Sequence, residues 1–207
     1  MLEHVHFGGI RMKGPLIVFA GRSNVGKSST IRVLTGRKVR VGKHPGSTKY
    51  ELPIDLGSVT VVDIPGFGHM AGTSKTAIEE MKTSLIQKLE DWSNDIALAV
   101  LILDISLFRE LVERWEARGE IPIDIEFYTF LSEIADNVIV VANKIDKLRK
   151  KKQKEELDYL RSRFLQALPD REPLIVSTSA TRKVGTSELK EVIDDTISAA
   201  GLDRPNW

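Results

Sequence analysis

Short runs of apolar residues alternate along the chain with segments in which apolar residues recur every three or four positions. The runs have the length and the β-branched content of buried strands. They lie at residues 16–20, 59–62, 96–103, 138–142 and 173–176. The segments between them predict one helix that begins near residue 27 and others at 73–92, 106–117, 123–134, 155–168 and 187–199. This alternation predicts an α/β fold, with a mostly parallel sheet and helices on both of its faces.

The first apolar run leads into a stretch that matches the pattern G-x-x-x-x-G-K-[ST]. Gly21 and Gly26 allow backbone conformations in which successive N–H groups turn inward around a phosphate, and the following helix adds its own free N–H groups. Lys27 supplies a positive charge toward the β and γ phosphates, and Ser28 is placed to reach Mg²⁺. The alternative is a strand-to-helix turn without a ligand. We predict a phosphate loop formed by Gly21, Arg22, Ser23, Asn24, Val25, Gly26, Lys27, Ser28 and Ser29.

Two further stretches are predicted to complete the phosphate site. Residues 37–50 form a long polar loop, from which the Thr48 hydroxyl could complete Mg²⁺ coordination when a γ phosphate is present. Asp63 follows the second apolar run, where a carboxylate at a strand end can hold a Mg²⁺-bound water. Gly66 offers a backbone N–H to the γ phosphate. The residues assigned to these stretches are Pro45, Gly46, Ser47, Thr48, Asp63, Ile64, Pro65 and Gly66.

The fourth apolar run ends in an N-K-x-D group made of Asn143, Lys144 and Asp146. A guanine base presents its ring N–H and its amino group on one edge, and the Asp146 carboxylate can accept both hydrogen bonds, whereas adenine has no such edge. The Lys144 stem would lie along the base plane, and Asn143 would connect this loop to the phosphate loop. Ser179 and Ala180, after the last run, could present their backbone to the guanine oxygen. Standing alone, N-K-x-D would indicate only a polar turn.

Length, charge and cysteine content narrow the class of protein. The 207 residues fit one domain, with residues 1–14 as an N-terminal arm and residues 201–207 as a C-terminal tail. The net charge is +1, so contact with nucleic acid would need a local basic patch. The sequence has no cysteine, no signal-peptide pattern and no apolar run of about 18 residues. We therefore expect a monomeric cytoplasmic protein without a membrane contact.

Two terminal features stay open on sequence grounds. His4 and His6 would share one face of an extended segment, but no carboxylate cluster accompanies them. This favours an edge strand or an ordered arm over a metal site. The tail either frays or docks through Trp207.

In order and wording, these motifs resemble the EngB (YihA) family of P-loop GTPases, in the translation-factor-related class. The resemblance covers nearly the whole chain and rests on the stretches that begin at Gly21, Pro45, Asp63, Asn143 and Ser179. It implies a single-domain P-loop GTPase with a six-stranded, mostly parallel sheet, GTP or GDP as ligand and Mg²⁺ as cofactor. Bacterial members act in assembly of the large ribosomal subunit, which implies ribosomal RNA or a ribosomal subunit as partner.

The same resemblance frames the expected chemistry. Lys27, Thr48 and Gly66 are the residues we assign to GTP hydrolysis. Efficient GTPases place a glutamine after the glycine of the second switch, and this chain has Phe67 there, so we expect slow intrinsic hydrolysis. Asn24 lies where related potassium-stimulated GTPases place a ligand for the monovalent cation. A hydrogen bond that merely stabilises the loop is an equal alternative for Asn24.

Three functions compete on these grounds. The first is a GTP/GDP switch whose state depends on whether Thr48 and Gly66 contact a γ phosphate. The second is a GTP-gated regulatory module with a non-ribosomal partner, such as the cytosolic domain of a membrane transporter. The third, a P-loop kinase for a small substrate, would have no use for Asn143 and Asp146.

Overall fold

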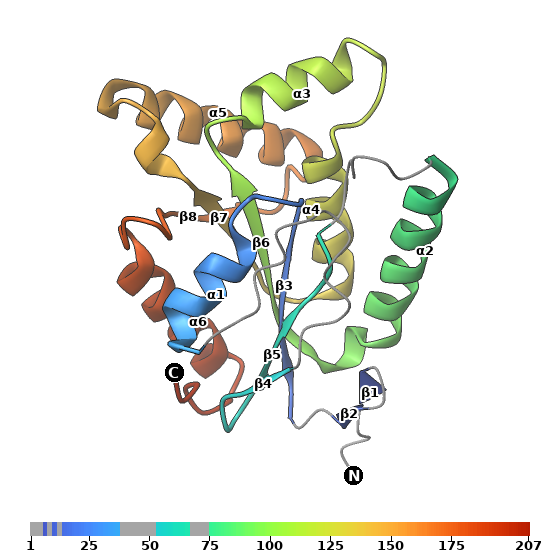
Figure 1. Cartoon of the computed structure of the whole chain (residues 1–207), viewed down its shortest axis with the longest axis vertical. Coiled ribbons are helices and arrows are strands. Elements are labelled where there is room, and N and C mark those ends of the chain that lie inside the picture. Colours follow the sequence, from blue (N-terminus) through green and yellow to red (C-terminus); the bar gives the residue numbers. More distant parts are fainter. Residues whose placement is uncertain (1–5, 8–9, 12–13, 38–52, 67–74) are drawn as a thin grey trace.

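A computed structural model describes residues 6–7, 10–11, 14–37, 53–66 and 75–207 of the chain. Within them, a six-stranded sheet lies between two layers of helices (Figure 1). Its strand order is β4-β5-β3-β6-β7-β8. The strands are β3 (Leu16–Gly21), β4 (Ile54–Asp55), β5 (Thr60–Asp63), β6 (Ile96–Asp104), β7 (Val138–Asn143) and β8 (Leu174–Ser177). Only β4 is antiparallel to its neighbour in this described sheet, which confirms the mostly parallel six-stranded α/β fold.

Alternate side chains of β3 pack into two different hydrophobic cores, because successive residues of a strand point to opposite faces. Leu16 and Val18 belong to the larger core, and Ile17 and Phe19 belong to the other. The larger core is covered by α2 (Lys75–Asp91), α3 (Phe108–Glu116), α4 (Ile123–Ile134) and α5 (Lys150–Ala167). The other face is covered by α1 (Lys27–Thr35) and α6 (Thr186–Ala199). Burial on both faces explains why these strands read as nearly continuous apolar runs.

Most elements begin and end within a few residues of the positions expected from the sequence, and two differences have a physical reason. The apolar pattern misses β4, because two residues are too few to show a period. The helix expected from residue 155 begins at Lys150. Its first turn consists of lysines and glutamine without an apolar residue or an acidic one, so the apolar period starts only further along.

The two ends of the chain contribute differently to the fold. β1 (His6–Phe7) pairs with β2 (Ile10–Arg11) in a separate two-stranded antiparallel sheet. His4 lies outside the described residues, and those residues contain no group of three or more histidine or acidic side chains that could hold a metal ion. The C-terminal tail docks instead of fraying. Trp207 Nε1 donates to Asp194 Oδ1 at 2.6 Å, and the backbone N–H of Asn206 donates to the Leu56 carbonyl at 2.9 Å.

Candidate nucleotide-binding site

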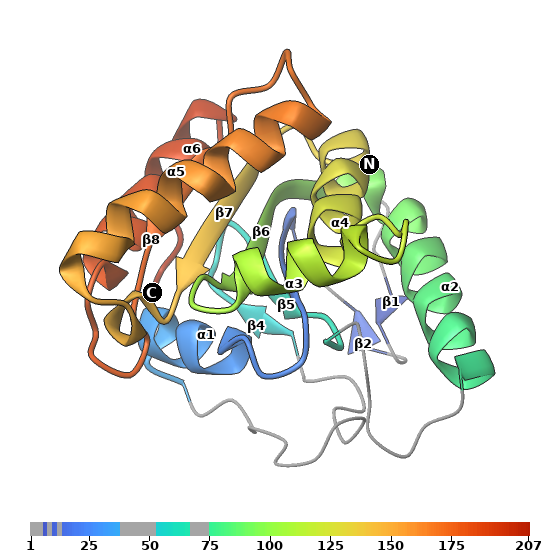
Figure 2. The ribbon, with the colours of Figure 1, turned by 90° about the horizontal axis from the view of Figure 1, so that it is seen from above.

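Those predicted site residues that the structure describes gather at one edge of the sheet, where the parallel strands β3, β5, β7 and β8 end (Figure 2). In an open α/β sheet, the carboxyl ends of parallel strands form the usual ligand-binding crevice. The phosphate loop follows β3, Asp63 ends β5, Asn143 ends β7, and Ser179 lies two residues beyond β8. Motifs that are far apart in the sequence therefore meet in one place.

Gly26 marks the point at which the phosphate loop becomes α1. It is the N-cap of the helix, with a φ of 101°, a left-handed conformation that costs other residues strain. A Cβ at this position would lie 2.3 Å from Nδ2 of Asn143. Both the conformation and the close approach require glycine, and they leave the loop backbone against the end of β7.

Lys27 and Ser28 both contact the carboxylate of Asp63. The Lys27 ammonium forms a buried ion pair and hydrogen bond with Oδ1, and the Ser28 hydroxyl donates to Oδ2 at 3.0 Å. The register of β3 and β5 places Phe19 beside Asp63, so the strand end lies next to the start of the phosphate loop. A serine hydroxyl beside a carboxylate is an oxygen donor set that suits Mg²⁺, and the lysine supplies charge for phosphates.

Gly66 approaches the phosphate loop closely. A Cβ there would lie 2.9 Å from the backbone nitrogen of Ser23 and 3.0 Å from its Cα. Only glycine therefore fits this contact without a shift of the loop. The arrangement places Gly66, three residues after β5, beside Ser23 of the phosphate loop. The remaining residues predicted for the second switch, from Phe67 onward, lie outside the described residues, as do Pro45, Gly46, Ser47 and Thr48.

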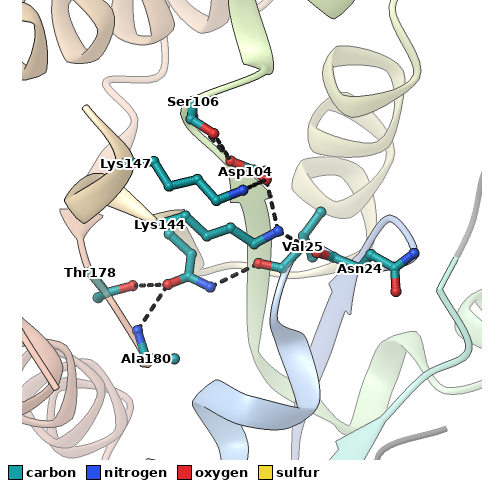
Figure 3. A network of polar contacts seen from close by, with 9 residues as sticks. Asn24, Val25, Asp104, Ser106, Lys144, Lys147, Thr178 and Ala180 are labelled. Carbon is teal, nitrogen blue, oxygen red and sulfur yellow. Dashed lines mark hydrogen bonds and ion pairs between the residues drawn. The ribbon is translucent and has the colours of Figure 1, made fainter. Parts of the chain in front are cut away.

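The buried amide of Asn143 joins three loops. Its Nδ2 donates to the Val25 carbonyl of the phosphate loop at 2.8 Å. Its Oδ1 accepts from the Thr178 hydroxyl at 3.1 Å and from the Ala180 N–H at 3.2 Å (Figure 3). The connection that the sequence predicted between the N-K-x-D group and the phosphate loop is present, and it extends to the loop after β8.

Sequence reasoning missed Asp104, which is the shared partner of Ser106, Lys144 and Lys147 in Figure 3. Asp104 ends β6, and its carboxylate accepts from Lys144 Nζ at 2.8 Å and from the Ser106 hydroxyl at 2.6 Å; Lys147 Nζ lies 3.6 Å away. Burial acts to raise the pKa of Asp104, but the hydrogen bonds and charges of these partners outweigh it and hold that pKa below its ordinary value. The signal was available, because an acid at the end of a buried strand also identified Asp63.

Lys144 spans the gap between Asp104 and the phosphate loop. Besides its contact with Asp104, its Nζ donates to the Asn24 carbonyl at 2.5 Å. Its backbone has a φ of 64°, a left-handed conformation that few residues other than glycine adopt. The ammonium of Lys144 is therefore held by two acceptors, Asp104 and the Asn24 carbonyl, and the aliphatic stem extends between the end of β7 and the phosphate loop. The side-chain amide of Asn24 points away from this network (Figure 3).

The three remaining base-loop residues have different environments. Asp146 is exposed in the short helix η2 (Ile145–Lys147), so its carboxylate is accessible to a ligand. Ser179 and Ala180 are buried. Their N–H groups donate to the Val184 carbonyl and to Asn143 Oδ1, respectively. Contact between this backbone and a guanine oxygen therefore stays a prediction.

A second acid that the sequence did not single out lies beside Arg22. Asp124, in the first turn of α4, is buried, and its Oδ2 lies 3.8 Å from Nη1 of Arg22. Burial raises the pKa of Asp124 to about 6, while the charge of Arg22 acts to lower it. A carboxylate thus lies buried against the phosphate loop although it makes no hydrogen bond to the arginine.

Comparison with known proteins gives the family. A family model described as "50S ribosome-binding GTPase" matches residues 16–144, more than half of the chain. The Pyrococcus horikoshii protein named "Probable GTP-binding protein EngB" is 41% identical over 181 residues, which cover 87% of this chain and 83% of that protein. The chain belongs to the EngB family of P-loop GTPases. The family places it among the enzymes that hydrolyse GTP to GDP and phosphate.

Other EngB proteins extend the match over most of the fold. A Methanopyrus kandleri protein with the same name is 40% identical over 192 residues, covering 90% of this chain and 94% of its own length. A crystal structure of a probable GTP-binding protein EngB has a TM-score of 0.78 and 41% identity, over 89% of this chain and 99% of that one. Among the described residues, no helix is long and apolar enough to cross a membrane.

The Asn143 contacts predict the effect of a single isosteric change in this EngB protein. Asn143→Asp replaces the donor that faces the Val25 carbonyl with a buried carboxylate oxygen, while the acceptor side is kept. We expect a loss of about 3 kcal/mol in the free energy of unfolding, together with weaker nucleotide binding. Urea denaturation measures the first effect. The exposed Asn94→Asp is the matched control, with an expected change within about 0.5 kcal/mol. Equal unfolding free energies for the two variants would contradict this role of Asn143.

Proposed function

We propose that this chain is a GTP/GDP switch that hydrolyses GTP slowly and acts in assembly of the large ribosomal subunit. The observation that carries the switch is the buried amide of Asn143, which connects the predicted base-binding loop to the phosphate loop. A P-loop kinase for a small substrate would need no such connection. The ribosomal part is supported by the description of the matching family model, "50S ribosome-binding GTPase".

The phosphate end supplies the residues for Mg²⁺ and for hydrolysis. Lys27 would stabilise charge on the β and γ phosphates, and Ser28 and Thr48 would be ligands of Mg²⁺. Asp63 would hold a water on the metal from its position beside Ser28. When bound, Mg²⁺ would neutralise the charge that develops on the phosphates. The Gly66 N–H would then contact the γ phosphate, next to Ser23.

The base end would select guanine. Asp146 would accept two hydrogen bonds from the guanine edge, and its exposure leaves the carboxylate accessible. Lys144 would cover one face of the base with its aliphatic stem, because its ammonium is held by Asp104 and Asn24. Slow turnover is supported by Phe67, which cannot orient a water as glutamine does.

A monovalent cation is the proposed accelerator. The side chain of Asn24 is exposed. The backbone carbonyl of Asn24 already accepts a hydrogen bond from Lys144, so the side-chain amide oxygen is the group of this residue that would bind K⁺. The cytoplasmic location and the monomeric state expected from the sequence stay predictions. A regulatory module with a non-ribosomal partner is the alternative, and it would share the whole nucleotide site.

Nucleotide competition tests the guanine assignment. We expect unlabelled GTP, but not ATP, to displace labelled GDP. Asp146→Asn should weaken GDP binding by about 100-fold and shift preference toward xanthine nucleotides, because the amide no longer accepts both hydrogen bonds. Asp158→Asn, an exposed change on α5, should leave the affinity unchanged. Displacement by ATP as effective as by GTP would remove the guanine assignment.

Single-turnover hydrolysis tests the cation. We expect a higher rate in K⁺ than in Na⁺ at equal ionic strength, and Asn24→Ala should abolish the difference because it removes the amide oxygen. GDP affinity, measured in both salts, separates a catalytic effect from weaker binding. Equal rates in the two salts would rule out the cation proposal.

Co-sedimentation with ribosomal subunits tests the partner. The first turn of α5 exposes Lys150 and Lys151, which we propose contact RNA phosphates. We expect association with the large subunit to depend on whether GDP or a non-hydrolysable GTP analogue is bound. Lys150→Glu/Lys151→Glu should weaken association and lower its salt dependence, whereas the control Arg118→Glu/Arg204→Glu, which reverses two other exposed charges, should not. Absence of association in both nucleotide states would reject the ribosomal role.

A further inference from the structure

Arg22 and Asp124 form an incomplete ion pair beside the phosphate loop. The two side chains are 19% and 7% exposed, and the shortest contact, from Nη1 to Oδ2, is 3.8 Å. That distance is within the range of an ion pair but beyond the range of a hydrogen bond. The pair therefore gains charge attraction in a buried place without the directional contact that normally accompanies it.

Each partner also carries a buried polar atom that is not satisfied within the described residues. Arg22 Nε and Asp124 Oδ1 are both buried and have no hydrogen-bond partner there. Buried charged groups are normally both paired and hydrogen-bonded, and an exception in a native fold calls for an explanation. Because Arg22 belongs to the phosphate loop, we look for the explanation in the function of that loop rather than in the stability of the fold.

Both partners belong to well-defined elements of the fold, Arg22 to the loop after β3 and Asp124 to α4. Arg22 immediately follows β3, and its carbonyl accepts from the Val25 N–H at 3.5 Å in the turn of the phosphate loop. Asp124 lies on a helix whose inward side chains are buried in the larger core, among them Phe127 and Leu131. The carboxylate thus lies on a helix that packs into the core, and the guanidinium belongs to a residue of the loop that is predicted to surround the phosphates.

We propose that Asp124 is a positioning residue for nucleotide binding: from the first turn of α4, its carboxylate holds the guanidinium of Arg22 and keeps the phosphate loop in the conformation that receives the phosphates. The inference rests on the proposed guanine-nucleotide function and adds α4 to it. Glu126 belongs to the same part of α4 and accepts from Lys82 of α2 at 2.8 and 2.9 Å. The helix therefore contacts both the phosphate loop and the helix that follows the second switch.

A simpler role for Asp124 is to stabilise the helix, because an acid in the first turn interacts favourably with the helix dipole. The two roles differ in their consequences. Helix stabilisation predicts a change in thermal stability with no change in nucleotide affinity, and it gives Arg22 no part. Positioning predicts a change in affinity that depends on Arg22.

The test measures the GDP dissociation constant of the full chain by fluorescence titration with a labelled GDP. We expect Asp124→Asn to raise the constant about tenfold at pH 7.5, the size of coupling found between contacting charged residues. Arg22→Gln should have a similar effect, and the double variant should bind no more weakly than the weaker single variant. Glu126→Gln, on the same part of the helix, is the matched control and should bind as the wild type does.

The pH dependence of GDP affinity shows whether the charge of Asp124 matters or only the shape of its side chain. The pKa of about 6 means that the carboxyl group is protonated below this pH and loses its attraction for Arg22, the charged group that acts on it from another element. On α4 itself, Glu126 is engaged by Lys82. The terminal phosphate of GDP also titrates near pH 6, so the readout is the ratio of the two dissociation constants. The GDP dissociation constant of Asp124→Asn, divided by that of the wild type, should fall from about ten at pH 7.5 toward one at pH 5.

Several outcomes would overturn the inference. A ratio near one at pH 7.5, a ratio that stays constant down to pH 5, or additive effects of Arg22→Gln and Asp124→Asn would each do so. Circular dichroism establishes that every variant is folded, and Asp124→Glu, which keeps the charge, gives a second reading if Asp124→Asn does not fold. Affinity close to that of the wild type in Asp124→Glu supports the role of the charge, and a loss as large as in Arg22→Gln contradicts it. If the wild-type chain does not bind GDP, the proposed function fails instead.

Discussion

The contact between Asn143 and the phosphate loop is the constraint around which the nucleotide end is built. One buried amide uses both of its ends, donating to the loop after β3 and accepting from the loop after β8. Gly26 permits the approach, because any side chain there would overlap the amide nitrogen. Strand order makes the contact possible: β3 and β7 both flank β6, so their ends face each other across one strand.

Two ion pairs, each made of an aspartate and a lysine, flank this contact. Asp63 faces Lys27 on one side, and Asp104 faces Lys144 on the other. Each acid ends a buried strand and each lysine begins the loop or helix that follows a neighbouring strand. Each ion pair restricts the orientations of its lysine, and a restricted side chain loses less entropy when it binds a ligand. Preorganisation of this kind suits the function proposed above, in which the protein holds a nucleotide and hydrolyses it slowly.

The sequence predicted those parts of the site that repeat a local pattern. The phosphate loop, Asp63 and the N-K-x-D group each follow an apolar run directly, so strand-end position identified them. Asp104 had the same signal but no motif around it. Asp124 had no signal at all, because its contact with Arg22 joins residues about a hundred positions apart and depends on how α4 packs. Contacts fixed by helix packing leave no period or spacing in one sequence.

The two outermost strands of the described sheet are both short. β4 has two residues and β8 has four, whereas the central β6 has nine. Unpaired backbone groups at a sheet edge invite pairing with another chain, and short edge strands are one way in which proteins limit this. The docked tail adds to the effect, since the backbone N–H of Asn206 donates a hydrogen bond to the Leu56 carbonyl, which directly follows β4. The long apolar strands, which carry the greatest tendency to aggregate, are therefore shielded in the folded protein, and exposing them requires the central sheet to open.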